Sequence, residues 1–213
     1  PRDAPGASRA GGCDTDQGGR CVTGSSTKIH PTAEVDSGAT VGDGTLIWQH
    51  CIILAGAVVG DGCKLAHNVF VEAGVRIGDG VTIKDNVALY DGVVIGDDVF
   101  IGPNAVFTNV IKPRAFIGRK SEFEKTHIGK GASVGANATI VCGNTIGEYA
   151  LIGAGTVIIA DVPSHALVVG NPARQIGWVS RTGRKLDDDL RCLESGERYV
   201  SVGDGIRLVV DDG

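Results

Sequence analysis

The side chains best suited to chemistry recur at intervals of 18 residues in the middle of the chain. One series is His50, Asn68, Asn86 and Asn104, and the series one position earlier is Gln49, His67 and Asp85. An imidazole titrates near neutral pH, which makes His67 a candidate general base. With Tyr90 and Asp91, these residues predict that one polar edge of the fold lines a cleft. The alternative is that each asparagine only satisfies a left-handed turn.

A basic segment follows at residues 108–127. It carries five cationic side chains against two acidic ones in a chain of net charge −5: Lys112, Arg114, Arg119, Lys120 and Lys125 against Glu122 and Glu124. Guanidinium groups bind carboxylates and phosphates with two parallel hydrogen bonds. The segment therefore predicts an anionic ligand, with a merely solvated loop as the alternative.

The elements that position these residues are set by an aliphatic residue at every sixth position. The series is unbroken over fourteen positions from Ile29 to Phe107, and it resumes at Ile128 and runs to Ile158. The fourth residue of each hexad is almost always Gly, Asn or Asp, the types that tolerate a left-handed backbone. Each hexad therefore predicts a short strand that ends in a tight turn.

Hexads of this kind predict an all-β parallel β-helix. Three strands make one triangular coil, and each strand stacks on the coil before it and buries its aliphatic residue inside. Twenty hexads correspond to six or seven coils. The basic segment breaks the repeat, so we expect it to be a loop extruded from the solenoid, where function commonly resides.

Hexads of the form [LIV]-G-x-x-[small]-x resemble those of the hexapeptide-repeat acyltransferases, which fold as left-handed β-helices. The segments TNVIKPRA, RKSEF, GANATIVCG, IGEYALIGAG and VPSHALVVGNPARQIGW narrow the resemblance to the sugar-nucleotide N-acetyltransferases of surface-polysaccharide (O-antigen) synthesis. The group most similar is the UDP-2-acetamido-3-amino-2,3-dideoxyglucuronate 3-N-acetyltransferases. The resemblance covers about Ile29 to Trp178. It implies a homotrimer, with acetyl-CoA in a groove between subunits and the nucleotide sugar near the loop.

The resemblance also implies site residues. Asn86 would orient the attacking amine, with His67 as the rival general base or a substrate contact. The expected substrate-binding residues are Asn68, Asp85, Tyr90, Asp91, Asn109, Arg114, Arg119 and Lys120. The expected acetyl-CoA contacts are Lys130, Gly135, Ala136, Gly153, Ala154 and Arg174. A β-solenoid needs the glycines in any case, so their assignment rests on the resemblance alone.

Other functions on the same fold stay open. One is acetylation of a 3-amino-dideoxyhexose on a dTDP carrier, and another is a non-catalytic scaffold, against which the basic loop and GNPAR argue. A γ-type carbonic anhydrase would need two histidines five residues apart. The histidines here are at 30, 50, 67, 127 and 165, so we expect no metal.

The composition of the chain limits the classes of protein to which it can belong. The chain of 213 residues is 42% hydrophobic and has 33 glycines, which suits a coil of turns. Its negative charge argues against non-specific nucleic-acid binding. The chain has no apolar run long enough to span a membrane and no secretory signal, so we expect a cytoplasmic enzyme.

The chain divides into three parts by its pattern. We expect a disordered arm at 1–28, with unpaired thiols at Cys13 and Cys21, and the β-helix at 29–178. An extension at 179–213 should contain a β-hairpin of Tyr199–Val202 and Ile206–Val210.

Overall fold

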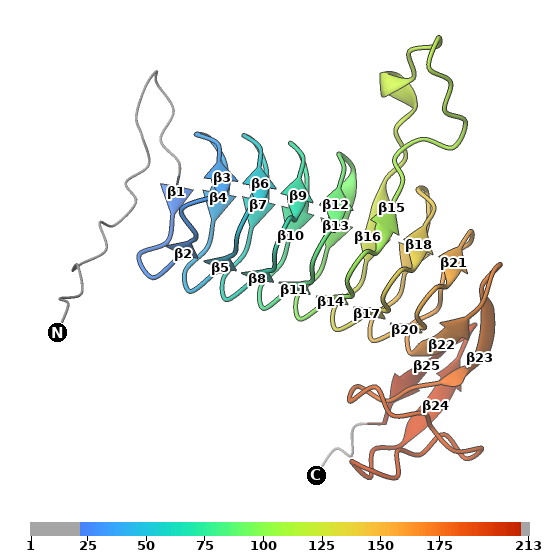
Figure 1. The fold of residues 1–213 in the computed structure, drawn as a ribbon. Helices are drawn as coiled ribbons and strands as arrows, with labels where there is room; N and C mark the ends of the chain where they lie inside the picture. The colour runs from blue at the N-terminus through green and yellow to red at the C-terminus, as the bar shows by residue number, and fades with distance from the viewer. Residues whose placement is uncertain (1–21, 210–213) are drawn as a thin grey trace, which may run out of the picture.

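The computed structural model describes residues 22–209, which form a parallel β-helix with a loop near its middle and a small cap at its end (Figure 1). Residues 1–21, with Cys13 and Cys21, lie outside the described part. The predicted all-β fold class is confirmed, because the 25 strands of the described chain are accompanied by a single 3-10 turn, η1 (Lys120–Glu122).

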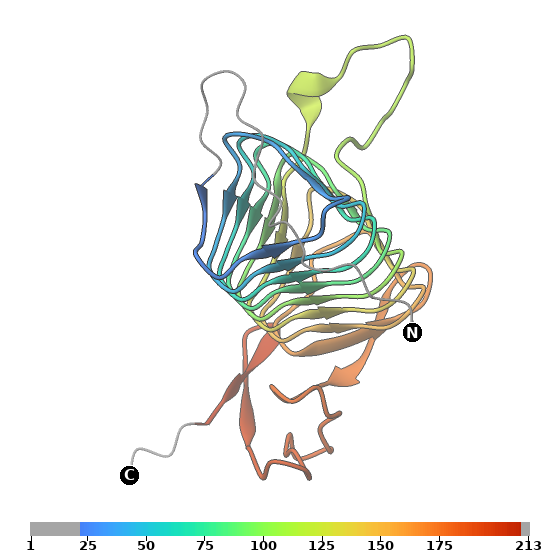
Figure 2. The same cartoon turned by 60° about the vertical axis from the view of Figure 1, so that its left-hand side comes forward.

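Three sheets make the faces of a triangular prism (Figure 2). Sheet A contains β1 (Val22–Thr23), β4 (Thr40–Val41), β7 (Val58–Val59), β10 (Arg76–Ile77), β13 (Val93–Ile95), β16 (Thr126–Ile128) and β19 (Thr145–Ile146). Sheet B contains β2 (Lys28–Ile29), β5 (Leu46–Ile47), β8 (Lys64–Leu65), β11 (Thr82–Ile83), β14 (Phe100–Ile101), β17 (Ser133–Val134), β20 (Leu151–Ile152), β22 (Ala166–Val169) and β23 (Arg174–Trp178). Sheet C contains β3 (Glu34–Val35), β6 (Ile52–Ile53), β9 (Phe70–Val71), β12 (Ala88–Leu89), β15 (Val106–Phe107), β18 (Thr139–Ile140) and β21 (Val157–Ile158).

The hexad explains this geometry residue by residue. Its aliphatic position fills the inside of the prism, as at Leu65, Ile83 and Leu89, which are fully buried. Its fourth position takes a left-handed backbone, with φ of 67° at Gly44 and 60° at Asn68. Strands 18 residues apart pair in parallel, so side chains at that interval stack in columns along the prism.

Each coil turns at three corners, which we name by the sheets they join. The AB corner follows a strand of sheet A, the BC corner follows a strand of sheet B, and the CA corner follows a strand of sheet C. A residue's corner is therefore fixed by its place within the 18-residue coil, and six residues carry the chain from one corner to the next.

The ends of the solenoid differ from the prediction in two places. β1 lies within the range expected to be a disordered arm, because Val22 and Thr23 pair with Thr40 and Val41. Thr23 occupies the aliphatic position of its hexad, which hides this first strand from the hydrophobic pattern. The loop is also shorter than expected, since residues 126 and 127 already belong to β16, which pairs with β13.

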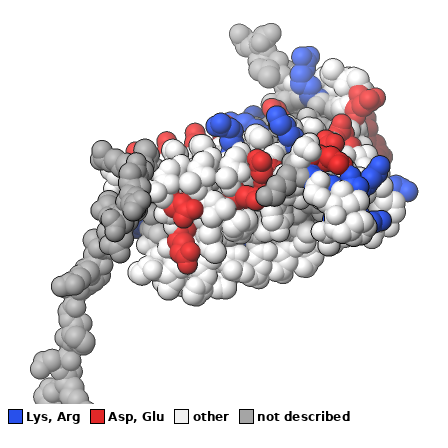
Figure 3. All heavy atoms as spheres, turned by 90° about the horizontal axis from the view of Figure 1, so that it is seen from above, with Lys and Arg blue, Asp and Glu red and all other residues white. Residues whose placement is uncertain are grey.

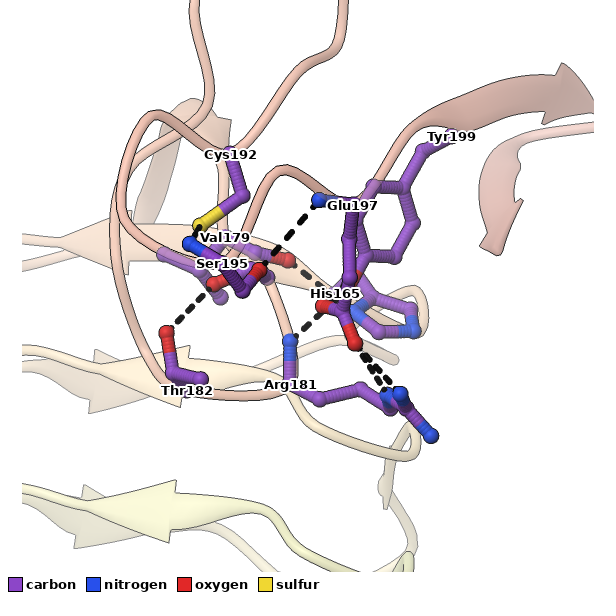
Figure 4. Close-up of polar contacts among 9 residues, drawn as sticks. His165, Val179, Arg181, Thr182, Cys192, Ser195, Glu197 and Tyr199 are labelled. Atoms are coloured by element: carbon purple, nitrogen blue, oxygen red, sulfur yellow. Dashed lines mark hydrogen bonds and ion pairs between the residues drawn. The ribbon is translucent and has the colours of Figure 1, made fainter. Parts of the chain in front are cut away.

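The C-terminal extension caps the last coils with a core of its own. The predicted hairpin is present as β24 (Tyr199–Val202) and β25 (Gly205–Leu208). The ring of His165, on the last coil, lies between Tyr149, with ring centroids 5.1 Å apart, and Tyr199, at 5.0 Å. His165 Nδ1 hydrogen-bonds the carbonyl oxygen of Val179, and Tyr199 donates to Glu197, which also pairs with Arg181 (Figure 4). These contacts fix the extension to the solenoid.

Candidate functional site

The asparagine series forms a ladder along the BC corner. Asn68 Nδ2 donates to Asn86 Oδ1 at 3.0 Å, and Asn86 Nδ2 donates to Asn104 Oδ1 at 3.1 Å. All three have a positive φ, between 57° and 60°. The ladder therefore gives each asparagine a structural role in its turn.

The ladder leaves Asn86 with a free hydrogen-bonding position. An amide oxygen has two lone pairs, and the bond from Asn68 uses one of them. Asn86 is exposed, so the second lone pair of Oδ1 can accept a hydrogen bond from a ligand. The turn role and the predicted orienting role are compatible at this residue.

The neighbouring series lies beside the ladder at the same corner. The rings of His67 and His50 are in edge contact, with centroids 5.5 Å apart. His67 is exposed and Asp85 is half-buried, and both line a groove of about 290 Å³ that continues onto sheet B. The BC corner thus combines an imidazole, a carboxylate and an amide on adjacent coils.

Most of the predicted acetyl-CoA contacts lie further along this same corner. Gly135 and Ala136 follow β17, and Gly153 and Ala154 follow β20, so both pairs continue the column towards the C-terminal end. A Cβ on Gly135 would come within 2.5 Å of the backbone nitrogen of Ala154, so glycine is required there by the stacking of the coils. Arg174 is exposed at the start of β23, and its side chain donates from Nη1 to the carbonyl of Ala173.

Lys130 lies at a different corner from the other predicted acetyl-CoA contacts. It follows β16 at the AB corner, where its Nζ lies 3.8 Å from carboxylate oxygens of both Asp97 and Asp98. Since Lys130 precedes Ala136 by six residues, the coil arithmetic places it one corner away. Lys130 therefore does not lie on the same corner of the chain as the other predicted acetyl-CoA contacts.

The AB corner carries a second ladder that the sequence interpretation missed. It consists of four aspartates at 18-residue intervals: Asp43, Asp61, Asp79 and Asp97. Each of the last three accepts a hydrogen bond from the backbone N–H of the aspartate before it, at 2.7 to 3.1 Å. The 18-residue interval would have revealed this ladder, which satisfies backbone donors at the turn.

Tyr90 and Asp91 also lie at a corner other than the expected one. Both follow β12 at the CA corner, where the ring of Tyr90 lies 6.3 Å from that of Phe70. The backbone N–H of Asp91 donates to Glu72 of the preceding coil at 2.9 Å. The predicted polar edge that joins these residues to His67 and Asn86 is therefore wrong, because the width of sheet C separates the two corners.

The loop leaves the solenoid at the CA corner too, between β15 and β16 (Figure 2). Its side chains form a hollow of about 350 Å³, lined by Val110, Pro113, Arg114, Ala115, Ile117, Arg119 and Phe123. The backbone carbonyl of Asn109 accepts a hydrogen bond from Glu124 at the base of the loop, and Lys120 begins η1.

The loop is less uniformly basic than its sequence suggests. Arg119 Nη1 contacts both carboxylate oxygens of Glu122, at 2.8 and 2.7 Å, so this pair is internally neutral. Arg114 has no acidic partner among the described residues, and its Nη1 donates to the Pro113 carbonyl. Figure 3, seen from the loop side, shows basic and acidic side chains next to one another. Arg114 is therefore the loop arginine that is available for an anion.

Within residues 22–209, no three His, Cys, Asp or Glu side chains are grouped so that they could hold a metal ion. The described part of the chain also contains no helix long and apolar enough to span a membrane.

Two models of repeat families match the chain. "Bacterial transferase hexapeptide (six repeats)" matches residues 38–73 and 74–109, and "Hexapeptide repeat of succinyl-transferase" matches residues 125–160. These three segments of 36 residues amount to 108 of the 213 residues, half of the chain.

Individual proteins give a more specific comparison. A dTDP-3-amino-3,6-dideoxy-alpha-D-galactopyranose 3-N-acetyltransferase of Aneurinibacillus thermoaerophilus is 49% identical over 86 residues, 39% of this chain and 44% of that protein. The match thus spans less than half of that relative.

Solved structures give a comparison of the fold. A UDP-N-acetylglucosamine acyltransferase of Bacteroides fragilis is similar in structure, with a TM-score of 0.62 and 18% identity over 74% of this chain and 62% of that one. The corresponding enzyme of Campylobacter jejuni has a TM-score of 0.56 and 17% identity over 74% and 70%. These structures show the same fold, consistent with a left-handed β-helix.

Proposed function

Because the chain belongs to the hexapeptide-repeat family of bacterial transferases, we propose that it transfers the acetyl group of acetyl-CoA to an amino group of a nucleotide-linked sugar. The observation that carries this proposal is the BC corner. It places an amide and an imidazole, Asn86 and His67, in neighbouring columns at the same corner as the turns at Ala136 and Ala154. The similar N-acetyltransferase of Aneurinibacillus supports the same class of reaction.

The favoured acceptor is the 3-amino group of a UDP-linked 2-acetamido-3-amino-2,3-dideoxyuronic acid, a precursor of surface polysaccharide. Its support is the likeness of the loop and GNPAR segments to the N-acetyltransferases of that substrate. The uronate supplies a carboxylate, for which the guanidinium of Arg114 is a suitable partner.

A second acceptor is a 3-amino-dideoxyhexose carried on dTDP. The relative with 49% identity acts on a sugar of this kind, which favours this candidate. Both acceptors present a 3-amino group to the same chemistry. They differ in the nucleotide, in the carboxylate and in the 2-acetamido group.

The reaction follows from the groups at the BC corner. Asn86 Oδ1 accepts a hydrogen bond from the neutral amine, which directs the nitrogen lone pair at the thioester carbonyl. A C–N bond forms and the C–S bond breaks, so the acetyl group passes to nitrogen and the thiolate leaves. The amine proton passes to the thiolate, or to His67 acting as general base. Asn68 and Asp85 flank the acceptor sugar.

The acetyl-CoA site runs from Asn86 towards the C-terminal end of the same corner. The backbone groups of Gly135, Ala136, Gly153 and Ala154 accompany the pantetheine arm. Arg174 binds a phosphate.

A second copy of the chain completes the site, in a homotrimer. The loop and the BC corner of one chain lie at different corners, so the loop of one copy contributes to the BC corner of the next. The residues that reach the substrates in this way lie at the CA corner or in the loop: Tyr90, Asp91, Asn109, Arg114 and Arg119. The loop exposes apolar side chains that a neighbouring copy would cover, among them Phe116, which is 84% exposed, and Ile111, which is 52% exposed.

The test is acetyl-CoA turnover against UDP- and dTDP-linked 3-aminosugars, each with and without the uronate carboxylate, with the product detected by mass. Turnover of the 3-amino uronate alone supports the first acceptor, and turnover of the dTDP-aminodeoxyhexose supports the second. If no aminosugar is acetylated and acetyl-CoA does not bind, the chain is a non-catalytic scaffold.

A further inference from the structure

The groove beside His67 contains residues that acetyl transfer itself does not use. It lies on the outer face of sheet B, where three successive coils turn towards the BC corner. Its lining is Trp48, Gln49, Lys64, Ala66, His67, Thr82, Ile83, Lys84 and Asp85. Of these, His67 and Asp85 face the reaction, and the others define a separate part of the surface.

The 18-residue coil explains the shape of the groove. Trp48, Ala66 and Lys84 occupy the same outward position on three adjacent coils. Coils are about 4.8 Å apart, so the first and third of these side chains stand about 10 Å apart. Ala66 is small and forms a floor between two long side chains. The result is a slot with an indole on one wall and an ammonium group on the other.

The lining has the chemistry of a nucleotide site. Trp48 is 50% exposed, so its indole is accessible to an aromatic ring. The face of an indole can stack on any of the nucleobases, because each of them has a flat aromatic face. Lys64 and Lys84 form no ion pair within the described part of the chain, which leaves both ammonium groups available to phosphate oxygens. Gln49 offers both donor and acceptor atoms to a base edge.

We propose that this groove binds the nucleoside diphosphate of the acceptor, with the base stacked on Trp48 and the diphosphate held by Lys64 and Lys84. The inference rests on the proposed N-acetyltransferase function and locates its acceptor. The sugar then extends past His67 to Asn86, at the end of the groove.

Coenzyme A also carries a nucleoside diphosphate, so the source must be distinguished. The acetyl-CoA contacts at Ala136 and Ala154 lie two and three coils beyond Asp85, about 10 and 14 Å along the corner. The groove extends in the opposite direction, over the coil of Asp85 and the two coils before it. The two substrates therefore approach Asn86 from opposite ends of the BC corner, which assigns the groove to the acceptor.

Tryptophan fluorescence tests the proposal directly, because the chain has only two tryptophans, Trp48 and Trp178. UDP and dTDP are titrated separately into the full-length protein and into the Trp48→Phe variant. We expect saturable quenching by at least one of them in the wild type and its loss in Trp48→Phe, which also corrects for nucleotide absorbance. Quenching that persists in the variant would place the nucleotide near Trp178 and overturn the proposal.

Binding of the same nucleotide to variants, measured by calorimetry, tests the individual contacts. Trp48→Ala should weaken binding about tenfold, which is about 1.4 kcal/mol and lies within the range for one stacked base. Lys84→Ala should also weaken binding about tenfold, because the diphosphate loses a cationic partner. Ala66→Leu fills the slot and should abolish binding without unfolding the chain, because the neighbouring coils carry larger side chains at that position. The matched control is Lys28→Ala, which removes a lysine from the same outward row of sheet B as Lys64, two coils away. It should bind as the wild type does.

The outcomes separate this inference from the proposed function. Trp48-dependent binding of UDP or dTDP without acetyl transfer would retain the groove and reject the transferase. Acetyl transfer without Trp48-dependent binding of either nucleotide would reject the groove alone. Quenching of Trp48 by coenzyme A, with neither UDP nor dTDP competing, would assign the groove to the donor and overturn the proposal.

Discussion

At the scale of single residues, Asn86 has two roles, and a substitution by alanine would disturb both at once. It holds a left-handed turn with φ of 60°, and it is the proposed partner of the attacking amine. Alanine removes the side chain and also strains the turn, at a cost of about 1 kcal/mol. Glycine removes the side chain and keeps the turn free of strain.

Asn86→Gly should therefore lower kcat about a hundredfold, because the amine is no longer aligned, while the melting temperature changes little. Steady-state kinetics and thermal unfolding are measured together on each variant. Asn104→Gly is the matched control, since it breaks the same ladder at φ of 57° one coil away. Equal losses of kcat in the two variants would show that the ladder, rather than an orienting contact, is what matters.

The sequence predicts which residues are candidates for the site better than it predicts which of them lie at the same corner of the prism. The 18-residue interval correctly places His67, Asn68 and Asn86 in neighbouring columns at one corner. Tyr90 and Asp91 are assigned to the wrong corner, because nearness in sequence is taken for nearness in space. An offset of six residues moves a side chain along a whole face of the prism, and counting residues from the nearest strand places both at the next corner.

At the scale of elements, the loop is the part with the clearest separable role. Arg114 has no carboxylate partner among the described residues, whereas Arg119 is paired with Glu122. The loop is attached at a corner without altering the pairing of the strands on either side. Changes at Arg114 should thus affect ligands without affecting the fold.

Arg114→Ala should raise KM for the nucleotide sugar about tenfold and leave KM for acetyl-CoA nearly unchanged, because a charge-assisted pair is lost from the acceptor alone. Both constants are obtained from initial rates with the other substrate saturating. Lys112→Ala, which removes a nearby charge from the same exposed loop, is the control. A similar rise in both constants would argue that the sugar does not lie at this loop.

The C-terminal extension is held in part by the imidazole of His165, which packs against Tyr199. Burial lowers the pKa of His165 below its usual 6.5, since the ring is enclosed by Tyr149 and Tyr199. The unfolded chain then binds more protons than the folded chain as the pH falls below about 6.5. The stabilisation from neutral His165 is complete above that pH and is lost as the pH falls through the folded-state pKa.

The melting temperature should therefore fall as the pH is lowered below about 6.5. The hydrogen-exchange protection factors of β24 and β25, which correct for the intrinsic exchange rate at each pH, should fall with it. His165→Asn is the informative variant, because asparagine tolerates the φ of 63° at this position. It should be less stable at neutral pH and should lose the pH dependence in this window. A wild-type dependence that is unchanged in the variant would place the titrating group elsewhere.

At the scale of the whole molecule, the sequence predicts the architecture well because one hexad dictates strand, turn and core together. The sheets, the parallel pairing and the hairpin at Tyr199 follow from the pattern. The exception is β1, where the polar Thr23 stands at an aliphatic position. The groove at Trp48 is not predicted, because it depends on the contrast between one small side chain and two large ones on adjacent coils.

The proposed shared site needs a neighbouring copy of the chain, and the resemblance to the hexapeptide-repeat acyltransferases makes three the expected number of copies. The mass in solution, measured by light scattering, should be three times the 21.9 kDa of one chain. Phe116→Ser should shift the protein towards smaller species, because this exposed ring is proposed to pack on a neighbour. A wild-type protein that acetylates its acceptor as a monomer would refute the shared site.

The most direct test of the account is mass-spectrometric analysis of the products formed by the full-length protein from acetyl-CoA and a nucleotide-linked 3-aminosugar. The BC corner predicts one acetyl group on the 3-amino nitrogen for each coenzyme A released, and strongly reduced product in Asn86→Gly. Release of coenzyme A without acetylation of the sugar, or undiminished product in Asn86→Gly, would contradict the assignment of this corner as the site of acetyl transfer.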